Sequence, residues 1–249
     1  TPAQQAWRDL GLLLEGAAAS RIAPYFDALV AQIGGRGARV MSLNRALAQF
    51  SERHGRLRWL IGGPTRHLSP WAKALRDDMR RAHRIDMVAG YFMPSPALLR
   101  RLKQAGKRRM AARVVTAALS DNKVTIAAAR FSYAGLLKRG VKVYEYAATK
   151  LHTKLYVVDH ATYIGSANFD MRSLFINLEL MLRIDDPAFA AHARAYVDGE
   201  IARSHEVTEA RYRAATGWWQ RGKQFVAWLL MTVADPAISR GLNWGIDEE

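Results

Sequence analysis

The residues that decide the fold are "LHTKLYVVDHATYIGSANFDMRS", at positions 151 to 173. This stretch places His152, Lys154 and Asp159 ahead of a short polar turn, Gly-Ser-x-Asn, at 165–168. Side chains two residues apart on a strand lie on the same face, so we expect His152 and Lys154 to project together. These groups indicate either phosphate chemistry or an ordinary basic strand followed by a loop.

Each of these groups has a use at a phosphorus centre. A neutral imidazole can attack phosphorus or move a proton near pH 7, and a neighbouring ammonium can match the charge on phosphoryl oxygens. The hydroxyl of Ser166 and the amide of Asn168 suit the same oxygens. Glu179, on the next predicted strand, is placed to accept a hydrogen bond from the second imidazole nitrogen and to hold its tautomer.

The alternative is a surface role. A His-x-Lys pair alone is typical of a solvated strand edge. The full spacing, His-x-Lys-x4-Asp-x5-Gly-Ser-x-Asn, is far more restrictive and favours phosphate chemistry. No metal-binding cluster accompanies the pattern in the sequence, so we expect no metal and no organic cofactor, with Lys154 supplying the positive charge.

The composition limits the partners. Lys and Arg number 37 against 22 Asp and Glu in the 249 residues, a formal net charge of +15. Such an excess favours a polyanion, either nucleic acid or an anionic lipid surface. The absence of cysteine excludes disulfides and thiol nucleophiles. No signal peptide opens the sequence, and no run of about 18 apolar residues could span a bilayer.

Predicted strands and helices alternate along the chain, which favours an α/β domain with a largely parallel or mixed sheet. Strands are predicted at 57–64, 85–94, 112–120, 141–146, 153–158, 162–165 and 177–184. Helices are predicted at 20–33, 69–84, 95–106, 121–140 and 187–205. Ser69 is expected to be the N-cap of the second of these helices, with Pro70 at its first position.

The C-terminal residues 217–236, "GWWQRGKQFVAWLLMTVADP", combine tryptophans, basic residues and a short apolar run. The uninterrupted run at 225–231 is too short to cross a bilayer. Tryptophans with flanking cations fit a helix lying in the headgroup layer of an anionic membrane. The other interpretation is a C-terminal helix docked on the core of the domain.

The motif at 152–168 resembles the signature of the phospholipase D superfamily. "AGYFMPSPALLRRLKQAGKR", "LSDNKVTIAAARFSYAGLLKRGVKVYEY" and "KLHTKLYVVDHATYIGSANFDMRSLFINLELML" resemble, in that order, the C-terminal half of bacterial cardiolipin synthases. "WRDLGLLLEGAAASRIAPYFDAL" resembles the segment that follows the first catalytic motif of those enzymes. The resemblance covers most of residues 7–245 and implies a phospholipase D-like mixed β-sheet flanked by helices, followed by an amphipathic helical tail.

The resemblance implies roles for the residues of the motif. His152 corresponds to a catalytic histidine, Lys154 to a phosphate-binding lysine, and Asp159 to a structural or electrostatic partner in the catalytic motif. Glu179 corresponds to a carboxylate that orients a histidine. Phosphate contacts are implied for Ser166 and Asn168.

The resemblance also implies that half of an active site is missing. The superfamily needs two motifs, one histidine to attack phosphorus and one to protonate the leaving alcohol, and no second His-x-Lys occurs in the sequence. Either the chain is a fragment without its N-terminal half, or two copies pair about a two-fold axis. The opening residues favour the fragment, in which His152 is the general acid and base. The remaining histidines are expected to have surface or packing roles: His54, His67, His83, His160, His192 and His205.

These observations predict three regions: an N-terminal helix with a basic connecting segment at 1–56, a phospholipase D-like catalytic domain at 57–210, and an amphipathic membrane-surface segment at 211–249. The expected reaction is phosphatidyl transfer from phosphatidylglycerol to give cardiolipin, at the cytoplasmic side of a bacterial inner membrane. A homodimeric phosphodiesterase or nuclease is the alternative, although the aromatic residues gather in one terminal block rather than along a groove. An inactive lipid-binding half-domain is a third.

Overall fold

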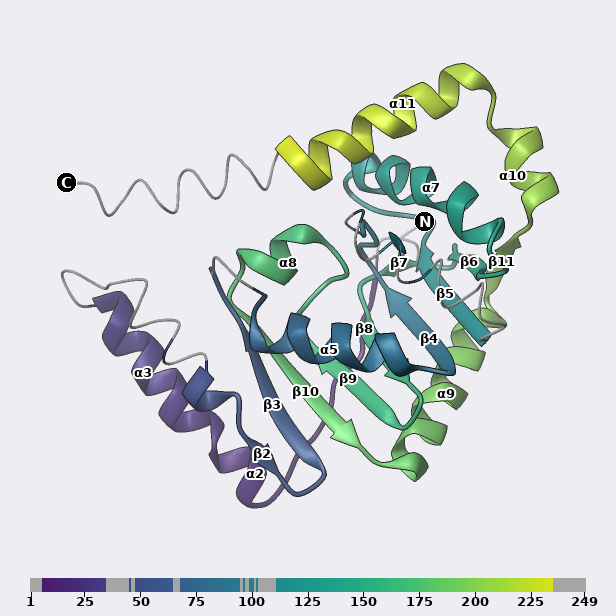
Figure 1. Ribbon diagram of the computed structural model, residues 1–249. Coiled ribbons are helices and arrows are strands. Elements are labelled where there is room, and N and C mark those ends of the chain that lie inside the picture. The colour runs from purple at the N-terminus through teal and green to yellow at the C-terminus, as the bar shows by residue number, and fades with distance from the viewer. Residues whose placement is uncertain are drawn as a thin grey trace, which may run out of the picture.

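A computed structural model describes residues 6–34, 45, 48–64, 68–94, 96, 99–100, 102 and 111–234. Its centre is a nine-stranded mixed sheet (Figure 1). The order is β11 (Ser204–Val207), β6 (Lys142–Tyr146), β5 (Ala111–Ala117), β4 (Arg84–Ala89), β8 (Lys154–Val158), β9 (Ala161–Gly165), β10 (Glu179–Asp185), β3 (Leu57–Gly62) and β2 (Arg53–His54). The pairs β4–β5 and β5–β6 are parallel and the other pairs are antiparallel.

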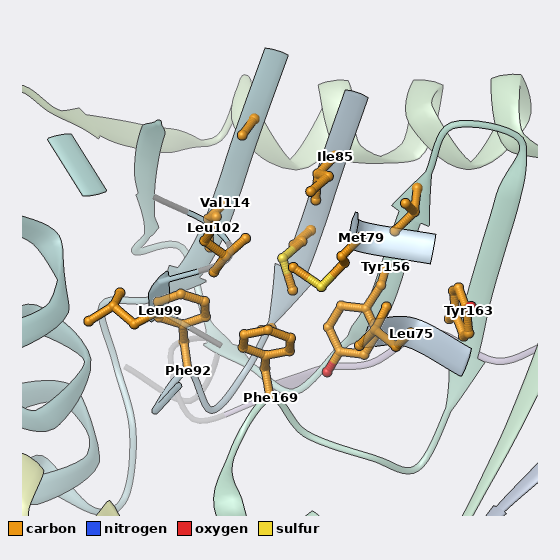
Figure 2. Close-up of a cluster of buried hydrophobic side chains, with 14 of the residues drawn as sticks. Leu75, Met79, Ile85, Phe92, Leu99, Leu102, Val114, Tyr156, Tyr163 and Phe169 are labelled. Atoms are coloured by element: carbon orange, nitrogen blue, oxygen red, sulfur yellow. The ribbon is translucent and has the colours of Figure 1, made fainter. Parts of the chain in front are cut away.

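Helices cover both faces of the sheet. One face carries α5 (Pro70–Arg81), α7 (Lys123–Leu137), α8 (Met171–Phe175) and α10 (Glu209–Ala215), and the other carries α9 (Pro187–Ile201). Figure 2 shows the core beneath the first group, where Phe92 stacks on Phe169 with ring centroids 5.6 Å apart. On the opposite face, Ala190, Ala193 and Val197 pack onto the sheet. Two covered faces explain why the central strand β8 is buried throughout.

The N-terminal residues pack against the same sheet. β1 (Trp7–Arg8) pairs in parallel with β7 (Lys150–Leu151), which directly precedes the motif. α2 (Ala17–Ser20) and α3 (Ile22–Gly34) follow, and the Trp59 indole on β3 donates a hydrogen bond of 2.8 Å to the carbonyl of Ala18. The start of the chain is therefore held beside the stretch that carries His152.

The C-terminal helix lies against α7 on the outside of the molecule (Figure 1). It consists of α11 (Trp218–Leu229), which runs on into the π-helical turn η1 (Leu230–Ala234). Within the described residues, no helix is both long enough and apolar enough to cross a bilayer.

The mixed sheet flanked by helices confirms the predicted fold class, with several local corrections. The helix predicted at 187–205 ends at Ile201, and β11 forms by pairing with β6. The short strands β1, β2 and β7 were not predicted, because two-residue strands have no periodicity of their own. Ser69 sits at the N-cap position, but its hydroxyl donates to the carbonyl of Leu174 instead of capping α5.

Some predictions lie outside the described residues. The helix predicted at 95–106 is described only at isolated positions, and much of the basic segment after α3 is not described. The division of the chain near residues 57 and 211 stays a prediction.

Candidate active site

Five of the six predicted site residues, all except Asp159, gather at one end of the sheet, where β4 and β9 end and β8 and β10 begin. An open cavity of about 1450 Å³ lies there. Its polar lining comes from Asp9, His152, Lys154, Ser166, Asn168, Asn177 and Glu179. Its apolar lining comes from Leu10, Leu12, Leu14, Trp59, Ile164, Ile176, Leu178, Leu180 and Leu182. The cavity thus combines a polar end with a long apolar wall.

His152 lies between β7 and β8 and is held on several sides. Its Nδ1 is 2.9 Å from a carboxylate oxygen of Asp9. The Trp7 ring meets the imidazole edge-on with centroids 5.0 Å apart, and the Tyr91 ring does so at 6.4 Å. A carboxylate can only accept, so Nδ1 carries the proton and Nε2 presents a lone pair. An Nε2 lone pair is what nucleophilic attack or proton transfer requires.

Asp9 is the residue that sequence reasoning missed. Burial tends to raise the pKa of Asp9, but hydrogen bonds from His152 and from the Leu10 N–H outweigh it, so this pKa lies below its usual value. The neighbouring Arg8 donates to the buried Glu200 at 2.7 Å, which fixes the segment. No pattern in the sequence singles out Asp9, because its partner lies 143 positions away along the chain.

Lys154 is buried beside the imidazole. Its ammonium is 2.8 Å from Nδ1 and 2.7 Å from Nε2 of His152 and donates to the His152 carbonyl at 2.6 Å. Burial lowers the pKa of Lys154, while Asp9, Glu179 and Asp170 act in the opposite direction. The structure thus places a cation next to the reactive nitrogen, where phosphoryl oxygens would need it.

Glu179 does not contact His152 in the way the sequence suggested. Its carboxylate accepts from the Ser166 hydroxyl at 2.5 Å and from the Asn177 amide at 3.2 Å. The Ser166 oxygen in turn accepts from the Leu180 N–H at 3.0 Å. Among the described residues, no histidine forms a hydrogen bond with Glu179, so the expected contact with His152 is not present.

The turn after β9 is built by close backbone contacts. A Cβ on Gly165 would lie 2.1 Å from the Leu180 carbonyl oxygen, so only glycine fits here. The Asn168 N–H donates to the Ser173 hydroxyl at 3.1 Å, while Oδ1 of Asn168 is buried without a hydrogen-bond partner among the described residues. The turn therefore leaves part of an amide unused in the cavity wall.

The preceding strand also needs a glycine. A Cβ on Gly90 would lie 2.6 Å from the Leu151 carbonyl oxygen and 2.9 Å from Cα of His152. The Gly90 N–H donates to the Thr153 carbonyl at 3.1 Å. Gly90 thus lets the backbone of His152 lie directly against the end of β4.

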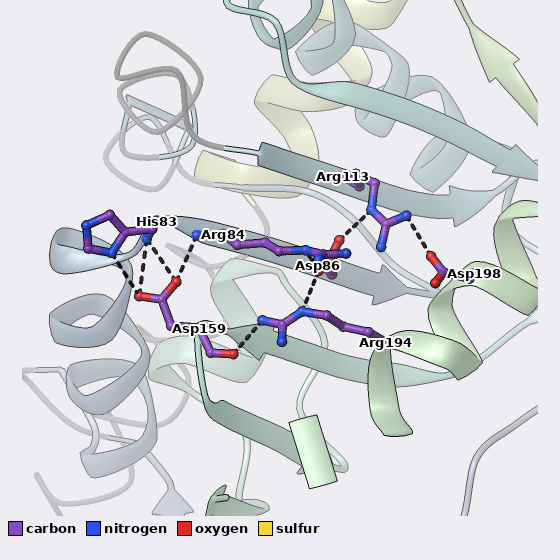
Figure 3. Close-up of polar contacts among 7 residues, drawn as sticks. All are labelled: His83, Arg84, Asp86, Arg113, Asp159, Arg194 and Asp198. Atoms are coloured by element: carbon purple, nitrogen blue, oxygen red, sulfur yellow. Dashed lines mark hydrogen bonds and ion pairs between the residues drawn. The ribbon is translucent and has the colours of Figure 1, made fainter. Parts of the chain in front are cut away.

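Asp159 does not reach the cavity. It follows β8 at the opposite end from His152, with a left-handed φ of 49°, and its carboxylate accepts from the backbone N–H groups of His83 and Arg84 (Figure 3). Asp159 thus takes no part in lining the cavity and makes structural contacts, one of the two roles that the resemblance implied. It ties the β8–β9 turn to the start of β4.

A buried ionic network supports this turn. The carboxylate of Asp86, fully buried on β4, accepts from Arg84, Arg113 and Arg194 at 2.8, 2.5 and 2.9 Å (Figure 3). Arg194 also donates to the Asp159 carbonyl. The arginines come from β4, β5 and α9, so one carboxylate joins three elements at the end of the sheet away from the cavity.

Two solved structures show the same fold. The phospholipase D family member Nuc from Salmonella typhimurium matches with a TM-score of 0.51 and 19% identity, covering 61% of this chain and 99% of that one. Phosphatidylserine synthase from Haemophilus influenzae Rd KW20 matches with a TM-score of 0.54 and 13% identity, covering 74% and 47%. The fold is therefore that of the phospholipase D superfamily.

Sequence relatives narrow the class. A family model described as "Cardiolipin synthase, PLD-like domain" matches residues 75–200, half of the chain, and the chain belongs to this family of phospholipid-modifying enzymes. Cardiolipin synthase A from Escherichia coli O157:H7 is 37% identical over 136 residues, which are 54% of this chain and 28% of that protein. Cardiolipin synthase A from strain K12 / DH10B is 36% identical over the same share. The chain thus spans little more than a quarter of the length of these relatives.

Proposed function

We propose that this chain supplies one of the two catalytic motifs of a phosphatidyltransferase that makes cardiolipin from phosphatidylglycerol. The observation that carries the proposal is the pairing at His152. Asp9 holds Nδ1, the His152 side chain lines the cavity, and the Lys154 ammonium lies 2.7 Å from Nε2. The family membership and the apolar wall of the cavity support a lipid as substrate.

The reaction needs two histidines. One Nε2 attacks the phosphorus of phosphatidylglycerol, a nitrogen–phosphorus bond forms, and glycerol leaves with a proton from the other histidine. The terminal hydroxyl of a second phosphatidylglycerol then gives its proton to that histidine and attacks the phosphorus. The nitrogen–phosphorus bond breaks, and cardiolipin is released. No atom or electron is left over, and glycerol is the only other product.

Within the described residues, His152 is the only histidine that lines the cavity. The second must come from another copy of the chain or from a longer protein that contains it. Glu179 is the group that would orient it, because its carboxylate is buried, accepts hydrogen bonds from Ser166 and Asn177, and has no histidine partner among the described residues. Lys154, Ser166 and Asn168 would bind the phosphoryl oxygens.

The test is a comparison of substrates. The active protein is incubated with phosphatidylglycerol vesicles, with single-stranded DNA and with double-stranded DNA, and cardiolipin, free glycerol and cleaved DNA are measured. The proposal predicts cardiolipin and glycerol in equal amounts and intact DNA. DNA cleavage without lipid products would establish the nuclease alternative in its place.

A further inference from the structure

The face of α11 that points away from the protein carries its large apolar side chains. Trp218 and Trp219 are 83% and 63% exposed, and further along the helix come Val226, Leu229, Leu230 and Val233, between 40% and 53% exposed. On a helix these positions fall on one side, because successive residues turn by about 100°. The stripe extends over α11 and η1.

The opposite face of the helix docks on the protein through both polar and apolar side chains. Gln224 is buried and accepts a hydrogen bond from the Tyr212 hydroxyl at 2.9 Å, and Thr232 is buried as well. Trp228 packs on Phe131 of α7, with ring centroids 5.1 Å apart. An ordinary surface helix buries its apolar side and exposes its polar side. This helix is already docked, so its exposed stripe needs a further apolar surface.

The charges around the stripe identify that surface as anionic. Residues 210–234 contain four basic residues and no acidic one. Lys223 lies 5.8 Å from the centre of the Trp219 ring, and Arg221 is exposed on the same helix. Cations beside exposed tryptophans match a headgroup layer of anionic lipid over an acyl-chain region. A protein partner with this match would need an acidic surface around an apolar groove.

Packed side chains also connect the helix that carries the stripe to His152. Trp228 of α11 and Met231 of η1 pack against a small core that Tyr91 also contacts. The Tyr91 ring in turn meets the His152 ring edge-on. Tyr91 therefore contacts both the cluster beneath the helix and the His152 ring.

We infer that the outward face of α11 and η1 is a docking surface for an anionic bilayer, in which the tryptophans and aliphatic side chains enter the interface while the helix lies flat. The inference rests on the proposed function only in taking lipid as the substrate. The binding itself requires no turnover. This arrangement would allow a lipid phosphate to be taken from the surface without leaving it.

Vesicle flotation of the full chain tests this inference. Wild type is expected to float with phosphatidylglycerol-containing vesicles and to stay behind with pure phosphatidylcholine vesicles. Val226→Glu places a charge within the stripe and is expected to weaken binding by at least about tenfold. Gln220→Glu adds the same charge on the same helix outside the stripe and is the matched control. It should bind within about twofold of wild type.

A second measurement locates the helix. Brominated acyl chains should quench the tryptophan fluorescence of wild type, and the quenching should fall in Trp218→Phe/Trp219→Phe. Equal binding by Val226→Glu and Gln220→Glu, or quenching unchanged in the double variant, would overturn the inference. The inference would also be overturned if a second copy of the chain covers the stripe. In that case wild type is a dimer, Val226→Glu is a monomer, and neither protein binds vesicles.

The two proposals fail in different ways. Vesicle binding that Val226→Glu removes, without any cardiolipin formed by the active protein, would refute the reaction and leave the docking surface standing. If the Val226→Glu protein still floats with vesicles and forms cardiolipin at an unchanged rate, the docking surface is refuted and the proposed reaction stands.

Discussion

At the scale of single residues, the central feature is the carboxylate that holds the imidazole of His152, the proposed catalytic residue. Asp9 accepts from Nδ1 of His152, and its pKa is lowered, so it stays ionised at neutral pH. A carboxylate that accepts from Nδ1 in this way fixes the tautomer and stabilises the imidazolium that forms during proton transfer.

Asp9→Asn should therefore lower kcat by about 10²-fold or more, since an amide can accept from Nδ1–H but cannot stabilise the imidazolium. The rate of lipid turnover gives the first readout, and the ¹⁵N shifts of the His152 ring give the second, because loss of the Nδ1–H tautomer would appear there. Asp27→Asn removes the same charge from an exposed position on α3 and serves as control. An unchanged rate with an unchanged tautomer would contradict the role of Asp9.

A second residue-scale feature is the buried carboxyl of Asp170. It caps α8 by accepting from the Ser173 N–H at 2.8 Å, and burial raises its pKa to about 6. The folded state thus holds a proton more tightly than the unfolded state, whose carboxyl has an ordinary pKa of about 4. The contribution to stability is complete below that value and is lost as the pH rises through about 6.

Asp170→Asn should remove this pH dependence, because an amide keeps the cap and never ionises. Between pH 4 and pH 7 the wild type is expected to lose about 2–3 kcal/mol relative to the variant. Denaturant unfolding of both proteins at several pH values gives the difference directly. Parallel stability curves for the two proteins would show that Asp170 has the same pKa in both states.

At the scale of elements, the contact between β9 and β10 sets the position of Ser166 opposite Glu179. Gly165 makes this possible, because any Cβ there would collide with the Leu180 carbonyl oxygen at 2.1 Å and approach Cα of Met181 to 2.9 Å. The turn that follows carries the polar groups of the cavity.

Gly165→Ala should lower the free energy of unfolding by about 1–3 kcal/mol, since backbone atoms rather than a flexible side chain must move. Gly199→Ala on α9 is the matched control. Its Cβ meets nothing within 4 Å, and alanine in a helix gains about 0.5–1 kcal/mol over glycine. Chemical denaturation measures both changes in the free energy of unfolding, which are expected to have opposite signs. Destabilisation by both variants would contradict the packing argument.

The sequence predicted most elements because their periodicity is local. β8, β9 and β10 lie close to the predicted positions, and the motif places His152, Lys154, Ser166, Asn168 and Glu179 around one cavity. What escaped prediction depends on distant partners. Asp9 acquires its role only when β1 pairs with β7, and β11 becomes a strand only because β6 offers an edge. Neither pairing leaves a periodic signal of its own.

At the scale of the whole molecule, the two ends of the sheet differ in structure. One end carries the open cavity, and the other carries the Asp86 network that joins β4, β5 and α9. A buried carboxylate with three arginine partners favours one arrangement of these elements, because any arrangement that separates it from the arginines leaves a buried charge uncompensated. The rigid end thus supports the end at which lipid chemistry is proposed.

The proposed reaction also requires a second catalytic histidine. The Asp9–His152 pair and the Glu179–Ser166–Asn177 group lie in one cavity, and within the part of the chain that the structure describes only the first of them includes a histidine. Two copies of the chain, or this segment within a longer protein, would complete the site. The mass of the active species distinguishes these two arrangements.

The most direct test is cardiolipin formation from phosphatidylglycerol by the active protein, with its oligomeric mass determined, for wild type, His152→Ala and His205→Ala. The account predicts that His152→Ala folds normally and loses at least about 10³-fold in rate, because its imidazole makes or protonates the bonds at phosphorus. His205→Ala alters an exposed histidine on β11 and should keep the wild-type rate. A folded His152→Ala protein with a near-normal rate would contradict the account.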